Sequence, residues 1–585
     1  MYIVLILKLI LYLFLLLFQR IKNIRFKFQI LKFFISNYSL KNLFKFFQDR
    51  NINPSKNLFF KKFTSLNQNK WKKTNFYNTN NKDDIFLTSF VHLPEDVIPN
   101  SIIAKYLANI KKSKIIAIID KEDIQAEIIM RSYGIKNFRY LKNPSIISEI
   151  IFFIKSFFLL EKIKTFKNLL NYKKNKIHFG KIVIEHVIRH TGKPYIEKLD
   201  FKVCYFLAQA FLLEKKIEKI FKEFSSRSMV MSENQFLPSG VIFQKALTNK
   251  ISVFGRSGAP KKISVVKFSN VNEIYTERAQ VSEKFYSLIT KKNINFISEK
   301  GKKLFYKRVN KMGDPSFKRE NFFSFNKSIK NYSKKDICKL YGWDENKKIL
   351  GIYAHTFLDG NYVVGWRTFN DNFDWLDSTL KVASNLKKFN FLAKPHPMDK
   401  FYKRAKFNTS NLIGNYIERY NNIKLFPDDI SIKSGLKVID VGITSHGTVS
   451  LECMSYGKPC ITAGRTSWGD MILNEKPISK KKYFYSLVNA EKLLKPKKDV
   501  IKKLHSYIYI QQNLMAIEHP LLADILVNRD VNRIQYWRES LKLLKKYNFK
   551  NDIFRSSFEY QIKNNFRHTI NLKKLEQLKI YEKLI

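Results

Sequence analysis

The sequence predicts an α/β protein with two domains, each built on a parallel sheet. Three observations lead to this prediction. The chain has 585 residues, enough for about two to four domains. Its composition is 45% hydrophobic and 15% aromatic, which supports a large core and excludes a disordered tail. Short apolar runs also alternate with helical patterns at close spacing, as expected for parallel strands joined by crossover helices.

The first α/β series predicts a domain over 81–325 with helical insertions. Its expected elements are strands at 84–93, 114–120 and 137–141, helices at 99–111 and 123–133, a helical stretch at 145–180, a helix at 198–223, and strands at 227–232 and 249–255. Residues 326–336 (NKSIKNYSKKD) are expected to be the linker to the second domain.

The second α/β series predicts a domain over 337–500, followed by C-terminal helices over 501–585. Its expected elements are strands at 347–355, 389–397, 436–443 and 458–464, and helices at 374–386 and 448–457.

The N-terminus has the pattern of a membrane address. Residues 1–18 are apolar apart from Lys8, and about 18 helical residues nearly cross a hydrocarbon core of about 30 Å. Basic residues follow at once, which places that flank on the cytoplasmic face of the inner (plasma) membrane. We therefore expect a membrane-associated helix and basic arm over 1–40, spanning the bilayer or lying on it, and a polar linker over 41–80.

The charge balance indicates an anionic partner. Lys and Arg number 106 against 49 Asp and Glu, a formal charge of +57. An anionic membrane surface or phosphorylated substrates fit this balance, and the Lys-, Asn-, Ile- and Phe-rich codon bias of an A+T-rich genome explains it equally well. The sequence argues against a nucleic-acid partner, because it has no helix-turn-helix, zinc-finger or RNA-binding signature. Four cysteines without Cys-x-x-Cys spacing exclude a disulfide scaffold and a structural zinc site.

The segment 440–470 is the most informative for chemistry. An apolar strand ends in Thr444-Ser445-His446-Gly447-Thr448, where a helix begins. The free N–H groups and dipole of a helix N-terminus favour a phosphate, and Gly447 permits close backbone approach. Ser445 and Thr448 can cap the helix, and Glu452, one turn further, can accept hydrogen bonds from a ribose diol. An ordinary Ser/Thr cap is the alternative.

Two further motifs follow strands. Lys394-Pro395-His396-Pro397 offers a Lys/His pair on a backbone restricted by two prolines, suited to a phosphate or a leaving-group oxygen. His355 and Asp359 follow the strand at 347–355 and fall at the same carboxyl edge.

These pieces together resemble the C-terminal half of bacterial capsule or surface polysaccharide biosynthesis proteins of the GT-B glycosyltransferase fold. The matching runs are YAHTFLDG (353–360), FNDNFDWLDSTL (369–380), KPHP (394–397) and SHGTVSLECMSYGKPCITAG (445–464). They are distantly similar to CDP-glycerol polymer transferases and to sialyl- and Kdo-transferases. The resemblance covers 345–470 well and 84–260 only in outline.

The resemblance implies two Rossmann-like domains facing a cleft, with the nucleotide sugar bound by the C-terminal domain. It implies phosphate or nucleotide contacts from Lys394, His396, Ser445, His446, Gly447, Thr448 and Glu452, with His355 and Asp359 in the donor/acceptor cleft. No metal or other cofactor is expected. The N-terminal domain would bind the acceptor and supply a general base, for which Glu185, His190 and Glu233 are the candidates, with His396 as a further catalytic residue.

The expected activity is transfer of a sugar from a nucleotide-activated donor to a growing surface polysaccharide or a lipid-linked acceptor. A polyol phosphotransferase of the teichoic-acid-polymerase type, using a CDP-activated donor, is the alternative enzyme. A non-hydrolysing sugar-nucleotide epimerase shares the architecture but needs no membrane arm. A basic polyanion-binding protein and an inactive membrane scaffold are the non-enzymatic alternatives.

Overall fold

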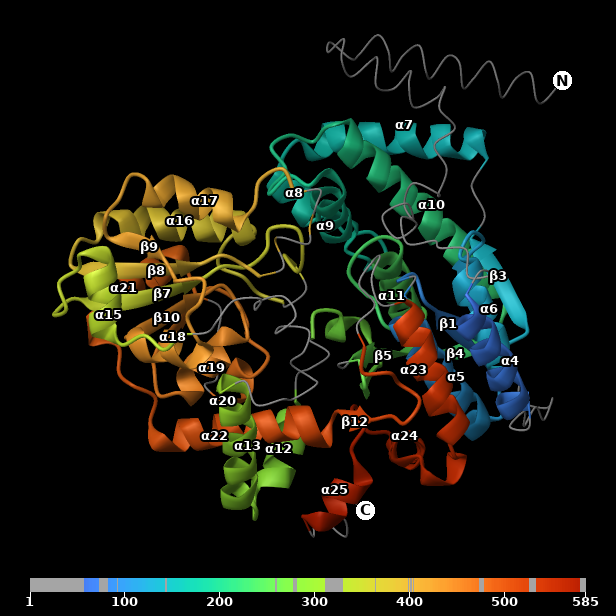
Figure 1. The fold of residues 1–585 in the computed structure, drawn as a ribbon. Helices are drawn as coiled ribbons and strands as arrows, with labels where there is room; N and C mark the ends of the chain where they lie inside the picture. Colours follow the sequence, from blue (N-terminus) through green and yellow to red (C-terminus); the bar gives the residue numbers. More distant parts are fainter. Residues whose placement is uncertain are drawn as a thin grey trace. The chain divides into compact units, whose positions relative to one another are not determined.

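The computed structural model describes residues 57–72, 83–91, 93–141, 145–257, 260–276, 281–310, 330–362, 365–397, 399, 402, 405–472, 478–525 and 533–578. The chain forms two compact units. Unit 1 comprises residues up to 190, 196–274 and 519–568, and unit 2 comprises 191–195, 275–518 and the residues from 569 onward. Each unit is Rossmann-like, which confirms the predicted fold class, while the expected cleft between them stays a prediction (Figure 1).

Unit 1 is built on a sheet in which its own strands have the order β6-β5-β4-β1-β2-β3. The strands are β1 (Asp84–Thr88), β2 (Ile115–Asp120), β3 (Asn137–Leu141), β4 (Ser226–Met231), β5 (Ser252–Ser257) and β6 (Lys262–Phe268). The first five strands pair in parallel, and β6 pairs antiparallel to β5. Their order, 3-2-1-4-5, is that of a Rossmann sheet.

The helices of unit 1 connect these strands and include two long ones on the β3–β4 crossover. They are α4 (Leu58–Lys72), α5 (Pro94–Lys111), α6 (Ile124–Ser132), α7 (Ile146–Ile163), α8 (Phe166–Leu170), α9 (Phe179–Thr191), α10 (Phe201–Glu223), α11 (Ser239–Thr248), α23 (Arg533–Lys546) and α24 (Ile553–Lys563). Side-chain caps fix several starts: Ser145 begins α7 and Asp200 begins α10.

Helix α4 corrects the expected linker over 41–80, because residues 58–72 form a packed helix of unit 1. Within this Asn- and Lys-rich segment, four residues at helical spacing lie on one face of the helix and are buried: Phe60, Phe63, Asn67 and Trp71. The Trp537 ring lies 4.7 Å from Phe60 and 5.3 Å from Phe63, measured between centroids. The stripe therefore joins α4 to the C-terminal helix α23.

A cluster of buried polar side chains connects the C-terminal part of unit 1 with helix α5 of the same unit. His519 Nε2 lies 3.1 Å from Asp552 Oδ2, and both side chains are fully buried. The hydroxyls of Tyr547, at 2.8 Å, and Tyr106 also donate to this carboxylate. Burial alone would raise the pKa of Asp552, but His519 and the two hydroxyls outweigh it and hold that pKa well below its ordinary value. Asp552 is therefore a carboxylate that links α5, the residues around 547 and α24.

Unit 2 is built on a fully parallel sheet with the order β11-β10-β7-β8-β9. The strands are β7 (Lys348–Tyr353), β8 (Phe389–Lys394), β9 (Ile423–Leu425), β10 (Val441–Thr444) and β11 (Cys460–Thr462). Taken in chain order, this is again 3-2-1-4-5, the same order as in unit 1. The two sheets thus follow the same topological rule.

The helices of unit 2 cover both faces of its sheet, with α16 and α17 on one face and α18 and α19 on the other (Figure 1). They are α12 (Glu283–Thr290), α13 (Ile294–Val309), α15 (Lys334–Tyr341), α16 (Asn372–Asn385), α17 (Thr409–Ile417), α18 (Ile432–Val438), α19 (Val449–Ser455), α20 (Gly469–Ile472), α21 (Lys480–Val488), α22 (Lys498–Tyr509) and α25 (Leu572–Gln577). The core beneath α16 contains Trp375, Leu376, Leu380, Phe391 and Ile443.

The structure differs from the sequence prediction at several boundaries. Residues 275–310, expected in the first domain, pack within unit 2, where α13 lies against α22. Residues 519–568, expected as terminal helices, belong to unit 1. Residues 436–438, expected to open a strand, end helix α18 instead, because the Ser431 hydroxyl caps a helix at this point. The first two differences arise because packing partners far along the chain decide where a segment belongs.

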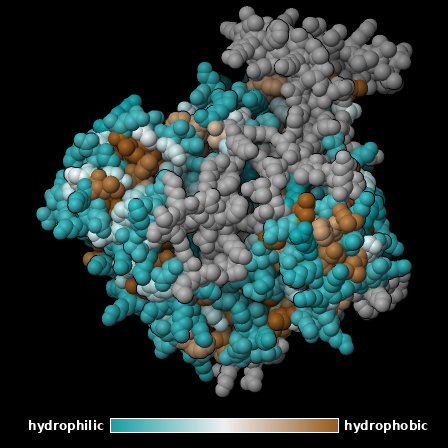
Figure 2. All heavy atoms as spheres, viewed as in Figure 1, coloured by the Kyte–Doolittle hydropathy of each residue, from teal (hydrophilic) through white to brown (hydrophobic). Residues whose placement is uncertain are grey.

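The expected membrane segment at 1–40 lies outside the described residues, as do residues 326–329 of the expected linker. Among the residues that the structure describes, no helix is both long and apolar enough to cross a membrane. In the view of Figure 2, hydrophilic residues cover most of the described surface and hydrophobic ones form smaller patches. In this view, the described residues therefore present mainly polar side chains at the surface.

We expect Asp552→Ala to destabilise the protein by about 3–5 kcal/mol, since it removes the only carboxylate partner that His519 has among the described residues and leaves buried polar groups unpaired. Glu559→Ala is the matched control, because Glu559 lies on the same helix and forms an exposed pair with Lys563 worth about 0.5 kcal/mol or less. Urea denaturation measures both. Equal midpoints for the two variants would show that the cluster contributes no stability.

Candidate functional site

The sheet of unit 2 has a topological switch point between β7 and β10. Strand order reverses there, because the chain proceeds from β7 to β8 and β9 on one side and to β10 and β11 on the other. In open α/β sheets, ligands bind outside the carboxyl ends of the strands at such a point. The loops after β7 and β10 flank this position, and the loop after β8 is adjacent.

Three histidines, one from each of these loops, come together at this edge. His355 follows β7, His396 follows β8 and His446 follows β10. The ring centroids of His355 and His446 are 4.2 Å apart with an interplanar angle of 17°, and those of His355 and His396 are 5.9 Å apart. The motifs that the sequence analysis singled out separately thus form one stack of imidazoles.

Two of the stacked imidazoles, His355 and His446, are held in the neutral form. Burial lowers the pKa of His355 well below its ordinary value, and the nearby His396 and Arg367 lower it further. Burial likewise lowers the pKa of His446, with contributions from His355, Arg367 and His396. At neutral pH these two rings therefore provide one N–H donor each and add no charge.

Arg367 is a central residue of the site that the sequence analysis missed. Its Nη2 lies 2.8 Å from His446 Nδ1, 3.1 Å from Ser445 Oγ and 2.6 Å from Asn372 Oδ1, and its Nη1 donates to the Asn361 carbonyl. The backbone of Arg367 pairs antiparallel with Gly464, just after β11, which carries the side chain to the edge. In the sequence, Arg367 is a single arginine in the long loop after β7, and no pattern around it indicated a functional role.

The loop after β8 is fixed through its backbone. The His396 amide donates to Thr409 Oγ1 at 2.9 Å, and the His396 carbonyl accepts from the Asp399 amide at 3.0 Å. The Asp399 carboxylate in turn accepts from the Thr409 amide at 3.0 Å and from its hydroxyl. This closed set of contacts sets the direction of the His396 side chain.

Charged side chains of both signs accompany the histidines: Lys394, Glu452 and Arg308. Burial lowers the pKa of Lys394, and the negative charge of Glu452 partly offsets this. Arg308 Nη2, on α13, lies 2.5 Å from Glu452 Oε1, with both side chains at most 15% exposed. The sequence analysis expected Glu452 as a ribose acceptor and missed Arg308, which lies about 140 residues before Glu452 in the sequence.

The start of α19 corrects the expected cap. Thr448 occupies the N-cap position, but its side chain makes no capping hydrogen bond. Ser445 Oγ instead accepts from Arg367 and lies 3.1 Å from His446 Nδ1. The helix ends as expected, at Gly457, whose φ of +83° suits glycine.

Gly447 packs closely on its neighbours. A Cβ at this position would lie 2.8 Å from His355 Nε2 and 2.9 Å from Thr444 Oγ1. Thr444 Oγ1 itself donates to the Tyr353 carbonyl at 3.2 Å. The group that lies close to Gly447 in the structure is the imidazole of His355, and the expected approach of a phosphate to this glycine stays a prediction.

Asp359 lies in the loop after β7, as expected, and accepts a hydrogen bond from the Tyr402 hydroxyl at 2.8 Å. Its backbone carbonyl also accepts from the Asn372 side chain at 3.4 Å. The contact with Tyr402 ties the loop after β7 to the segment that follows β8.

The three candidate bases lie in different settings in unit 1. Glu233 follows β4, at the switch point between β1 and β4, and its Oε1 accepts from the amides of Asn234 and Gln235 at 2.7 and 2.8 Å. Glu185 and His190 lie on α9; Glu185 is buried, and the His190 ring packs 4.9 Å from Phe206. By position, Glu233 is the one that lies directly at the carboxyl end of a strand.

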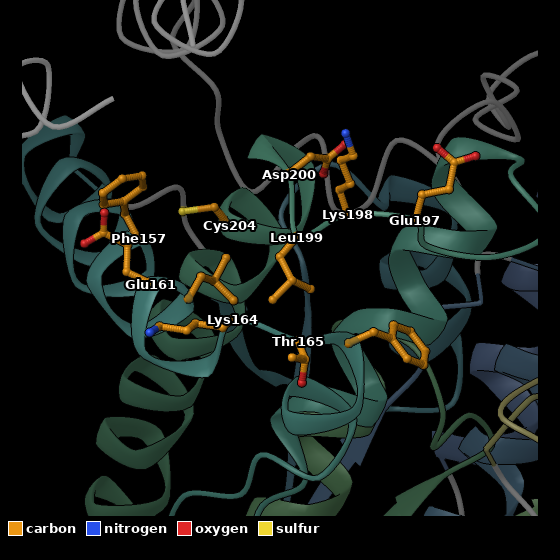
Figure 3. A pocket seen from close by; sticks show the side chains of 11 residues that line it. Phe157, Glu161, Lys164, Thr165, Glu197, Lys198, Leu199, Asp200 and Cys204 are labelled. Atoms are coloured by element: carbon orange, nitrogen blue, oxygen red, sulfur yellow. The ribbon is translucent and has the colours of Figure 1, made fainter. Parts of the chain in front are cut away.

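Unit 1 also contains a pocket of about 400 Å³ between the end of α7, the start of α8 and the segment before α10 (Figure 3). Leu160, Leu199 and Cys204 supply apolar lining, and Lys164, Lys198, Glu161, Glu197 and Asp200 supply charges of both signs. The pocket includes none of the predicted site residues. No sequence pattern indicated this pocket, because its lining comes from two segments that are separate in the chain.

Within the described part of the chain, no group of three or more His, Cys, Asp or Glu side chains is arranged to hold a metal ion.

Comparison with known proteins gives distant structural likenesses. No protein-family model matches the chain, and no curated protein matches it. Among solved structures, UDP-GlcNAc 2-epimerase from Neisseria meningitidis bound to UDP-GlcNAc aligns over 74% of this chain and 97% of its own, at 10% identity and a TM-score of 0.24. The S. aureus MnaA–UDP co-structure aligns over 78% and 97%, at 10% identity and a TM-score of 0.26.

A putative UDP-N-acetylglucosamine 2-epimerase from Listeria monocytogenes aligns over 74% of this chain and 94% of its own, at 8% identity and a TM-score of 0.24. Likenesses at these scores carry no argument about what this chain binds or does.

We expect Gly447→Ala to displace His355 and to destabilise unit 2 by about 1–3 kcal/mol, because the added methyl overlaps a stacked ring. Gly414→Ala is the matched control: it lies in helix α17, its Cβ would meet nothing within 4 Å, and alanine should be neutral or stabilising there. Thermal unfolding and the histidine proton NMR signals measure both variants. Unchanged histidine signals in Gly447→Ala would contradict the close packing.

Proposed function

We propose that unit 2 binds the diphosphate of a nucleotide-activated sugar and that the protein is a glycosyltransferase. The observation that supports this most directly is the convergence of Lys394, Arg367 and three histidines at the switch point of the sheet. Lysine supplies a compact positive charge, and neutral imidazoles supply directed N–H donors. A diphosphate needs both: charge to offset its own, and donors for its oxygens.

The same groups suit the departure of a nucleoside diphosphate. In a transfer, the acceptor hydroxyl oxygen bonds to the anomeric carbon, the bond from that carbon to the phosphate oxygen breaks, and the nucleoside diphosphate leaves with both electrons. Negative charge then grows on the leaving oxygen, where Lys394 and His396 would stabilise it. These donors are fixed before reaction, because the loop after β8 is held by its backbone contacts.

Glu452 supports a nucleotide rather than a simple phosphate. Its carboxylate can accept hydrogen bonds from the two hydroxyls of a ribose, and the ion pair with Arg308 would hold it in place. The proton of the acceptor hydroxyl requires a base, and Glu233 is our first choice because it lies at the switch point of unit 1. His190 and Glu185 are the further candidates.

The acceptor that we propose is a growing surface polysaccharide or a lipid-linked glycan on the cytoplasmic face of the plasma membrane. The sequence of residues 1–40, apolar and then basic, supports this location.

We expect the full chain to sediment with anionic phospholipid vesicles and a chain lacking residues 1–40 to lose most of that binding. Equal sedimentation of both chains would contradict a membrane role for this segment.

Nucleotide release tests the function. We expect the full chain in detergent, incubated with membrane extract and UDP-, GDP-, CMP- or CDP-activated donors, to release the nucleotide of one donor class. Lys394→Ala should weaken binding of that nucleotide about 10- to 100-fold, because a hydrogen bond to a charged group contributes about 1.5–3 kcal/mol. Lys388→Ala is the matched control, since Lys388 is an exposed lysine of the same unit paired with Glu491.

The same assay distinguishes a residue that acts as the base from residues that bind the nucleotide. It also distinguishes a glycosyltransferase from other classes of enzyme. Glu233→Gln should lower turnover about 10²- to 10⁴-fold and leave nucleotide binding intact. Release of CMP from CDP-glycerol would instead indicate polyol phosphate transfer, and interconversion of the donor without an acceptor would indicate an epimerase. Binding of no nucleotide by the parent protein would contradict the proposed site.

A further inference from the structure

The contact between Arg367 and His446 determines where the imidazole proton lies. A guanidinium group has only donors, and its Nη2 lies 2.8 Å from His446 Nδ1. Nδ1 must therefore be the accepting nitrogen, and the proton of the neutral ring must be on Nε2. Ser445 Oγ lies 3.1 Å from the same Nδ1 and can also donate to it. Both neighbours therefore favour the same tautomer.

Arg367 is itself held so that this contact persists. Its Nη1 donates to the carbonyl of Asn361, and its Nη2 also donates to Asn372 Oδ1 at 2.6 Å. Asn372 is buried, and its own side chain donates to the Thr356 carbonyl at 2.9 Å. The guanidinium is thus held by acceptors other than His446.

We propose that Arg367 is a positioning residue that fixes His446 as the neutral Nε2–H tautomer, so that the site offers the nucleotide diphosphate an uncharged donor at this point. This inference rests on the proposed function for its ligand, but the tautomer itself is a property of the free protein. It assigns Arg367 an action through His446 and not a contact with the ligand.

The groups around His446 oppose its protonation. Arg367 occupies the Nδ1 side with a permanent positive charge, and the His355 ring stacks on the imidazole at 4.2 Å with His396 beyond it. Burial and these three groups all lower the pKa of His446. His446 should therefore gain no charge across the range in which an ordinary histidine titrates, about pH 5–8.

Nitrogen NMR of the full chain with ¹⁵N-labelled histidine tests the inference. We expect His446, identified by the signal that His446→Asn removes, to show a protonated Nε2 and an unprotonated Nδ1 at pH 7. In Arg367→Met we expect mixed tautomers at this ring, whereas Arg419→Met, an exposed arginine of the same unit, should leave it unchanged. The remaining histidine signals report whether each variant is folded.

Affinity for UDP-GlcNAc, a probe with no group that titrates near neutrality, gives the second measurement. As the pH falls from 8 to 6, affinity should rise more steeply in Arg367→Met than in the parent, because the freed ring of His446 can gain a proton. A protonated Nδ1 in the parent, or a tautomer that Arg367→Met leaves unchanged, would overturn the inference. The expected tautomer in a parent that binds no nucleotide would overturn the proposed function and leave the positioning contact standing.

Discussion

Arg367 joins its own segment, 361–372, to the loop after β10 and to the residues after β11. It contacts the loop after β7 through Asn361, the start of α16 through Asn372, and the loop after β10 through Ser445 and His446, while its backbone pairs with Gly464 after β11. A planar group with five donors can satisfy several acceptors at once, and lysine cannot. The geometry of the candidate site depends on this one residue.

The parallel sheet makes that arrangement possible. Because β7, β8 and β10 run in the same direction, the loops that leave their carboxyl ends emerge at one edge. The reversal of strand order between β7 and β10 keeps the following helices apart, so that the loops can meet around a ligand. The stacked imidazoles are a consequence: partly buried rings that carry no charge, such as His355 and His446, can pack face to face where charged rings would repel each other.

Burial accounts for the chemistry that the site offers. It lowers the pKa of His355 and His446, so these two rings add no positive charge at neutral pH, and it also lowers the pKa of Lys394. Glu452 and Arg308 balance each other within this region. The result is a polar surface prepared for an anion without the self-repulsion that a cluster of free cations would have. Unit 1 shows the same dependence on burial in its cluster around Asp552, which there contributes to stability and not to a site.

The sequence alone determined the fold class and selected the candidate site residues of unit 2. Apolar runs such as IIAIID at 115–120 and KILGIY at 348–353 are strands because they are buried on both faces, and local pattern suffices to find them. The His-Pro motif and the run at 445–448 were found because parallel strands place such residues at one edge. Only the tertiary structure decided that Arg367 and Arg308 belong to the site, that Ser445 serves Arg367 and not a helix cap, and that 58–72 and 519–568 complete unit 1. These depend on contacts between residues far apart in the chain, and local periodicity carries no information about such contacts.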